Sequence, residues 1–182
     1  MISIPAFENF SFEEKSHIYK LENVILPSVS TIMNPLSKAL YENIDASILN
    51  KAADRGTAVH NAIENYILFG IVDIDDENKG YLDAFIQWYE DKKPKPIVTE
   101  SRVYHRVLRY AGTGDLIAEI DGKNLLIDYK TSATVNKMLT GVQLEAYSKA
   151  YDSHGVKVDG KMILHLKSDG KYQEIFYKKN DI

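Results

Sequence analysis

The sequence predicts one domain of mixed α/β (α+β) class, in which helices pack on a central mixed sheet. The length of 182 residues suits a single domain spanning 1–182. Apolar residues repeat at helical spacing in the first half, whereas they alternate at strand spacing in the second half. We therefore expect a helical part at about 28–91 and a sheet core at about 97–178, layered against each other.

The first elements along the chain are expected to be short. Residues 18–26 predict a strand that ends at Pro27. A brief helix follows over 28–33, where serines are available as caps. Pro35 is expected to break this helix, because proline lacks the backbone N–H that the helix needs. A second helical piece then covers 36–43.

Two longer helices follow in the first half. Asp45 is expected to cap the first, which stops near Gly70 in the left-handed conformation typical of helix ends. The second is amphipathic and covers 77–90, where its aromatic residues around Trp88 are expected to lie in the core. Two prolines in the loop 91–96 end it.

The second half predicts strands with one helix among them. An Asp121-Gly122 turn, a strong hairpin signal, separates two of the strands. A Ser168-Asp169-Gly170 turn separates the last two. The expected strands are 97–107, 110–120, 124–131, 157–166 and 172–178, and the expected helix is 136–151.

Composition excludes several classes of protein and site. The chain has no cysteine, which excludes disulfides, zinc–cysteine sites, thiol catalysis and cysteine-ligated iron–sulfur clusters. No apolar run approaches the ~20 residues that span a bilayer, and the acidic N-terminus broken by Pro5 is unlike a signal peptide. We therefore expect a cytoplasmic protein with no membrane partner. The net charge of -4 argues against coating nucleic acid through bulk charge, although it permits a local basic groove.

The Asp121-Gly122 hairpin gathers charged side chains. A two-residue turn pairs Asp115 directly with Asp128, with Cβ atoms ~4.5–5.5 Å apart. A four-residue loop would instead place Asp115 opposite Lys130. In both registers these three side chains share one face and Tyr129 points to the other, because strand side chains alternate. A three-residue loop would break the arrangement.

Two carboxylates on one sheet face suggest a cation site. At ~5 Å they repel by roughly 3 kcal/mol at an effective dielectric near 20, so a divalent cation between Asp115 and Asp128 would stabilise them. Mg²⁺ prefers such oxygen ligands. Lys130 would lie beside the metal, where it holds water or stabilises charge on a phosphate oxygen. The alternative is a solvated strand face with a chance salt bridge.

Four motifs occur in a fixed order along the chain: RGTAVH at 55–60, GTGD at 112–115, DYK at 128–130 and QLEAY at 143–147. Together with LPSVSTIM at 26–33, they resemble the PD-(D/E)XK nuclease superfamily, whose core is restriction-endonuclease-like. The resemblance is to the branch that holds RecB-type nuclease domains, CRISPR-associated exonucleases, mitochondrial genome maintenance exonucleases and related phage exonucleases. Many CRISPR-associated members hold an iron–sulfur cluster with four cysteines. This chain has none, so it resembles the cluster-free phage and mitochondrial type.

The resemblance implies a catalytic metal site. Asp115 and Asp128 would bind Mg²⁺ or Mn²⁺ together with the backbone carbonyl of Tyr129. His60 would add a ligand or lie against the metal-bound water, although a lone helix histidine is usually structural. Lys130 would assist the attacking water. Asp115, Asp128 and Lys130 are therefore the expected catalytic residues.

The resemblance also implies DNA contacts. Gln143 and Tyr147, four apart on one helix face, would contact DNA near the scissile phosphate, unless they are an ordinary helix-face pair. The other expected DNA-binding residues are Arg55, Thr131 and Ser132. Arg102, Arg106 and Arg109 are candidates for a DNA groove. Further site candidates are Glu100, which would approach the same site, and Glu64, which shares the metal face or is exposed.

The expected function is that of a metal-dependent deoxyribonuclease. The resemblance favours an exonuclease acting at DNA ends in phage-type recombination, replication or repair, and leaving a 5′-phosphate and a 3′-hydroxyl. The alternatives are a structure-selective endonuclease and a non-catalytic DNA-binding module of the same fold. Expected partners are DNA, single-stranded or with free ends, and an annealing protein or helicase. The setting would be the cytoplasm of a bacterial or phage-infected cell.

Overall fold

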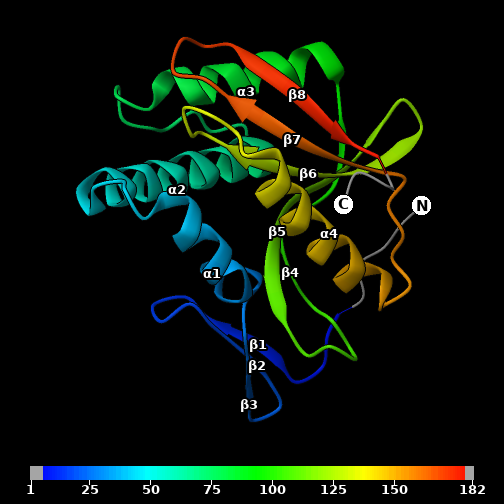
Figure 1. Cartoon of the computed structure of the whole chain (residues 1–182). Coiled ribbons are helices and arrows are strands. Elements are labelled where there is room, and N and C mark those ends of the chain that lie inside the picture. Colours follow the sequence, from blue (N-terminus) through cyan, green and yellow to red (C-terminus); the bar gives the residue numbers. More distant parts are fainter. Residues whose placement is uncertain (1–5, 179–182) are drawn as a thin grey trace.

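A five-stranded mixed sheet forms the centre of the molecule (Figure 1). The computed structural model describes residues 6–178, so the signal-peptide argument at Pro5 lies outside the described residues. The strand order is β4-β5-β6-β7-β8, with β6 and β7 parallel and every other neighbouring pair antiparallel. The strands are β4 (Lys95–Tyr104), β5 (Ala111–Ile120), β6 (Lys123–Lys130), β7 (Gly160–Leu166) and β8 (Tyr172–Tyr177). The predicted mixed α/β class is confirmed.

Helices cover both faces of this sheet. On one face, α2 (Ala46–Phe69) and α3 (Lys79–Lys92) pack their buried residues, Trp88 among them, on the even-numbered residues Leu116 and Ala118 of β5. On the other face, α1 (Val29–Tyr41) and α4 (Lys137–Asp152) pack on odd-numbered Ile117 and on Leu126 of β6. The helix α4 makes the crossover that the parallel pair β6 and β7 requires.

A second, three-stranded antiparallel sheet lies beside the start of β5. It consists of β1 (Phe10–Glu13), β2 (Ile18–Leu21) and β3 (Val24–Leu26). The prediction of one strand over 18–26 is wrong, because the chain turns at Glu22, whose φ of 58° is left-handed. The strand β1 was not predicted.

The predicted break at Pro35 is also wrong, since α1 continues through it. Proline at this position removes only one helical hydrogen bond, to the carbonyl of Thr31. The helix is held by its Ser28 cap, which accepts a hydrogen bond from the Thr31 N–H, and by buried Val29 and Met33.

The capping predictions at both ends of α2 are confirmed. The Asp45 side chain accepts a hydrogen bond from the Ser47 N–H, and Gly70 closes the helix with a φ of 68°. The following helix begins and ends two residues later than predicted, so α3 replaces 77–90 and the expected loop 91–96 shrinks to two residues. No helix within 6–178 is long and apolar enough to cross a membrane.

Candidate functional site

The site lies where the β5–β6 hairpin opens. The two-residue turn is confirmed, because the ladder runs from Ile120↔Lys123 to Leu116↔Ile127. Asp115 and Asp128 come directly after the last pair, one on each strand. The side chain of Asp115 reaches across and its Oδ2 accepts the Tyr129 N–H at 2.7 Å. The two aspartates therefore flank the point at which the strands separate.

The predicted division of faces holds along β6. Tyr129 is buried in the core formed with α2 and α3. Ile117 and Leu126 belong to the core formed with α1 and α4. By alternation, Asp128 and Lys130 lie on this second face. Alternation along β5 breaks at Asp115, because Leu116 lies in the first core whereas a Cβ atom on Gly114 would meet Tyr151 of the second.

Lys130 forms an ion pair with Asp128 inside this opening. The Asp128 side chain is only 3% exposed. Burial alone would lower the pKa of Lys130, but the charges of Asp128 and Asp115 outweigh it and raise the pKa. The ammonium group is therefore held charged next to two carboxylates.

A second group consists of His60, Glu100 and Asp115. His60 Nδ1 lies 3.6 Å from Glu100 Oε1 and 3.7 Å from Asp115 Oδ2. Potential ligand atoms of all three residues lie within 4.8 Å of one another. Ligands of an octahedral Mg²⁺, at about 2.1 Å from the ion, lie about 3–4 Å apart, so the measured separations suit one cation between them.

The environment of Glu100 bears on this fit. Its Oε1 atom is buried and accepts no hydrogen bond from the residues 6–178 that the structure describes. A buried carboxylate oxygen without such a bond is costly unless a positive charge lies beside it. Protonated His60, at 3.6 Å, supplies that charge in the absence of a metal. The donor set of two carboxylates and one imidazole also fits a divalent cation.

The backbone of Glu100 is strained in a way that serves this group. Its φ is 46°, in the left-handed region, which costs a non-glycine residue about 1–2 kcal/mol. The β4–β5 pairing omits Glu100 and resumes on either side of it, at Thr99↔Leu116 and Ser101↔Gly114. The residue opposite this gap is Asp115. The backbone distortion at Glu100 therefore lies next to another member of the His60 group.

The electrostatics of the group follow from its burial. Burial raises the pKa of Asp115 to about 7, with a contribution from the Asp128 charge and against the effect of His60. Burial would lower the pKa of His60, but Asp115 and Glu100 outweigh it and raise the pKa to about 9. The ring of Tyr129 packs edge-on against His60, with centroids 5.4 Å apart, and orients the imidazole. Without a cation, His60 therefore carries a proton at neutral pH.

Two glycines of the GTGD motif allow α4 to approach the site. A Cβ atom on Gly112 would lie 2.4 Å from the ring of Tyr147, and one on Gly114 would lie 2.6 Å from the hydroxyl of Tyr151. The motif therefore combines a carboxylate with the close packing that supports it.

A pocket of about 210 Å³ opens over these groups. Its lining includes six of the predicted site residues together with Ala52 and Gly56, but none of the carboxylates. The six are Arg55, His60, Tyr129, Lys130, Thr131 and Ser132. Arg55 Nε donates to Thr131 Oγ1 at 3.4 Å, which links α2 to the end of β6.

Gln143, Tyr147 and Glu64 do not line this pocket. Tyr147 is 8% exposed and packs on Gly112, while its hydroxyl accepts a long hydrogen bond of 3.4 Å from Gln143. Neither lines the pocket of the site. Glu64 is half-buried on α2, and burial and the charge of Glu100 raise its pKa. It does not belong to the His60 group.

The structure changes which carboxylates belong to the candidate metal site. Asp128, predicted as a metal ligand, pairs with Lys130 and lies outside the three-residue group. Glu100, predicted only as a further candidate, is central to it. Glu100 could have been found from its position opposite Asp115. That position follows from the register of β4 and β5, which the sequence did not predict.

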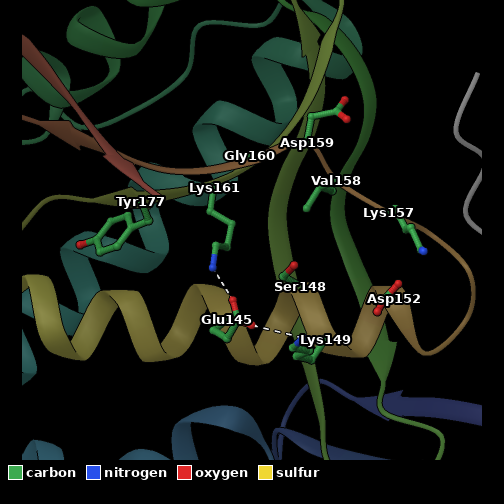
Figure 2. Close-up of a pocket in the computed structure, with 10 residues that line it drawn as sticks. All are labelled: Glu145, Ser148, Lys149, Asp152, Lys157, Val158, Asp159, Gly160, Lys161 and Tyr177. Carbon is green, nitrogen blue, oxygen red and sulfur yellow. Dashed lines mark hydrogen bonds and ion pairs between the residues drawn. The ribbon is translucent and has the colours of Figure 1, made fainter. Parts of the chain in front are cut away.

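A larger pocket, of about 580 Å³, lies between α4 and β7 and shares no lining residue with the site. Figure 2 shows Lys161 of β7 pointing at Glu145 of α4, with Lys149 beside it. Its charged groups balance one another, and the carboxylate group around His60 has no counterpart there. We assign no site to it.

Neither a protein-family model nor a curated protein sequence matches the chain.

Proposed function

We propose that the protein is a Mg²⁺- or Mn²⁺-dependent deoxyribonuclease of the PD-(D/E)XK type, acting as an exonuclease at DNA ends. The observation that carries the proposal is the group of His60, Glu100 and Asp115 beside the Asp128–Lys130 pair. The antiparallel meander β4–β6, followed by the crossover helix α4 and a parallel strand, supports the restriction-endonuclease-like core expected from the sequence motifs.

The cation would be held by His60, Glu100 and Asp115. The Tyr129 carbonyl and Asp128, which lie beside Asp115 across the hairpin, remain the further ligands that the motif resemblance implies. Bound there, the ion supplies a Lewis acid that lowers the pKa of a coordinated water and neutralises charge on a phosphate.

Lys130 has the charge and position to act on the reacting phosphate. Its partly exposed side chain pairs with Asp128 and lines the pocket. A fixed positive charge in a protein site stabilises developing negative charge more strongly than the same charge in water. We assign it to orienting the attacking water and stabilising the phosphate oxygen during hydrolysis to a 5′-phosphate and a 3′-hydroxyl.

The remaining pocket residues suit a nucleic-acid backbone. Arg55 contributes a cation, and Thr131 and Ser132 contribute hydroxyls; these are groups that commonly contact phosphates. Because Tyr147 is buried against Gly112, we assign it to positioning α4. DNA remains the proposed partner, with an annealing protein or helicase beside it.

A cleavage assay tests the proposal. End-labelled linear DNA and closed circular DNA, single- and double-stranded, are incubated with Mg²⁺, Mn²⁺ or EDTA. We expect loss of linear DNA only with a metal, none with Lys130→Ala, and full activity in the matched control Lys157→Ala, which lies at the separate pocket of Figure 2.

The outcomes separate the alternatives. Cleavage of the circle would identify an endonuclease, the second candidate. No cleavage of any DNA, in either metal, would overturn the proposal of a nuclease and leave the binding module. Cleavage by folded Lys130→Ala at the wild-type rate would show that this site does not perform the reaction.

A further inference from the structure

The tip of the β4–β5 hairpin exposes two adjacent apolar side chains. Val107 is 80% exposed and Leu108 is 67% exposed. Among the described residues, Val107 is the most exposed of the large hydrophobic side chains. Because both side chains are exposed on a projecting tip, neither is stabilised by burial within this chain.

The tip is nevertheless built with many hydrogen bonds. The N–H groups of Val107 and Leu108 both donate to His105 Nδ1, at 3.2 and 3.1 Å. The Arg109 N–H donates to the His105 carbonyl at 3.0 Å. The Arg106 N–H donates to Ser153 Oγ at the end of α4, at 3.1 Å. The apolar pair is therefore held outward by a defined loop.

Cations flank the apolar pair on both sides. Arg106 and Arg109 are exposed, and Lys149 joins Arg106 and Val107 at the base of the tip. Asp152 lies at the same base, and Lys149 is paired with Glu145, so the relevant cations are the two arginines. Arginines beside an apolar projection suit a polyanion with apolar surfaces between its phosphates, which describes stacked bases.

The tip is joined to the candidate site by two continuous strands. Glu100 lies on β4 and Asp115 on β5, the two strands that the tip connects. At about 3.3 Å per strand residue, the four steps from Asp115 back to Ala111 span about 13 Å. Figure 1 shows this hairpin extending beyond the five-stranded sheet, beside β1–β3.

We propose that Val107 and Leu108 form a wedge that unstacks the terminal base pair of a DNA duplex, while Arg106 and Arg109 hold the backbone. One separated strand then follows the hairpin towards His60 and Lys130. This inference rests on the proposed nuclease function and specifies its substrate: a duplex end that the protein opens itself.

The test uses the full chain with Val107→Ser/Leu108→Ser. The control is Ile71→Ser/Val72→Ser, which alters another exposed apolar pair, after α2. Cleavage of single-stranded DNA and of blunt duplex DNA is measured for each. In EDTA, a fluorescent adenine analogue at the duplex end reports unstacking upon binding.

We expect the wedge variant to cut single-stranded DNA within about twofold of wild type and blunt duplex at least about tenfold more slowly, a difference of about 1.4 kcal/mol in activation free energy. The fluorescence increase should disappear in the wedge variant and persist in the control. Arg106→Ala should weaken duplex binding and reduce its salt dependence by about one phosphate contact.

Other results overturn the inference in distinguishable ways. If the wedge variant matches wild type on both substrates, or if wild type cuts only single strands, the wedge is refuted while the nuclease proposal stands. The first result is also the one expected if the tip binds a protein. An equal loss of cleavage rate on both substrates would indicate that the tip binds DNA in general, and would refute the wedge. If wild type neither cuts nor binds any DNA, both proposals fail.

Discussion

Replacing Lys130 with alanine should destabilise the protein in the absence of metal, because it leaves the Asp128 carboxylate without its ionic partner. The Asp128 side chain is 3% exposed, whereas that of Lys130 is 24% exposed. Removing one member of a buried pair costs about 3–5 kcal/mol. Since the shortened side chain admits some water, we expect the lower end, about 3 kcal/mol.

Urea unfolding followed by circular dichroism in EDTA measures this cost. For a chain of this length, about 3 kcal/mol corresponds to a melting temperature roughly 6–12 °C lower. The double variant Lys130→Ala/Asp128→Asn should recover at least half of the loss, because it removes the uncompensated charge. The control Lys51→Ala breaks an exposed ion pair with Glu77. It should leave the urea concentration at the unfolding midpoint unchanged.

Two results would refute this reasoning. One is an unfolding free energy for Lys130→Ala within about 1 kcal/mol of wild type, the scale of an exposed pair. The other is a double variant as unstable as the single one, since the loss would then come from packing rather than from the buried charge.

Three further predictions concern packing and charge around α4. Gly114→Ala would place a Cβ atom 2.6 Å from the Tyr151 hydroxyl, so we expect a loss of about 1–3 kcal/mol in urea unfolding. Adding Tyr151→Phe should recover part of it, and equal losses in both variants would contradict the packing account. Glu145→Leu leaves Lys161, whose side chain is 9% exposed, without its partner and should cost about 1–3 kcal/mol; unchanged stability would argue that the pair contributes nothing. Partial burial would raise the pKa of Glu145, but Lys161 outweighs it and holds the pKa below 4.5. The stability contributed by ionised Glu145 is present above pH 4.5 and is lost as the pH falls through the folded-state pKa. Wild type should therefore lose more stability on acidification than Glu145→Leu. Parallel pH profiles of unfolding free energy would contradict this.

The sequence predicted the part of the site that depends on local turn chemistry. Asp121-Gly122 occupies a two-residue turn with φ values of 50° and 75°, and this turn determines the β5–β6 register. The shared face of Asp128 and Lys130 then follows from strand alternation alone, and the turn places Asp115 beside them across the hairpin. The positions of Asp128 and Lys130 required no knowledge of tertiary contacts, whereas the side-chain direction of Asp115 depends on the interrupted pairing with β4.

The role of Glu100 could not be predicted in the same way. The connection from Tyr104 to Ala111 contains no short-turn signal, so the β4–β5 register was unknown. Alternation also fails at Glu100 because its backbone is left-handed. Its approach to His60 depends on α2 packing across the sheet, a contact between segments far apart in the chain.

The helical half shows a similar limit. The caps at Asp45 and Gly70 are local features and were predicted correctly. Pro35 is a local signal as well, but packing of Val29 and Met33 overrides it. At Glu22 a turn forms without glycine, so composition did not mark it.

The most direct test of the central claim is a Mn²⁺ titration followed by calorimetry. Wild type should bind the ion, Asp115→Asn and Glu100→Gln should each weaken binding at least about tenfold, or about 1.4 kcal/mol, and Glu64→Gln should bind as wild type does. Absence of binding to wild type at millimolar Mn²⁺, or equal binding by all four proteins, would contradict a metal site formed by His60, Glu100 and Asp115.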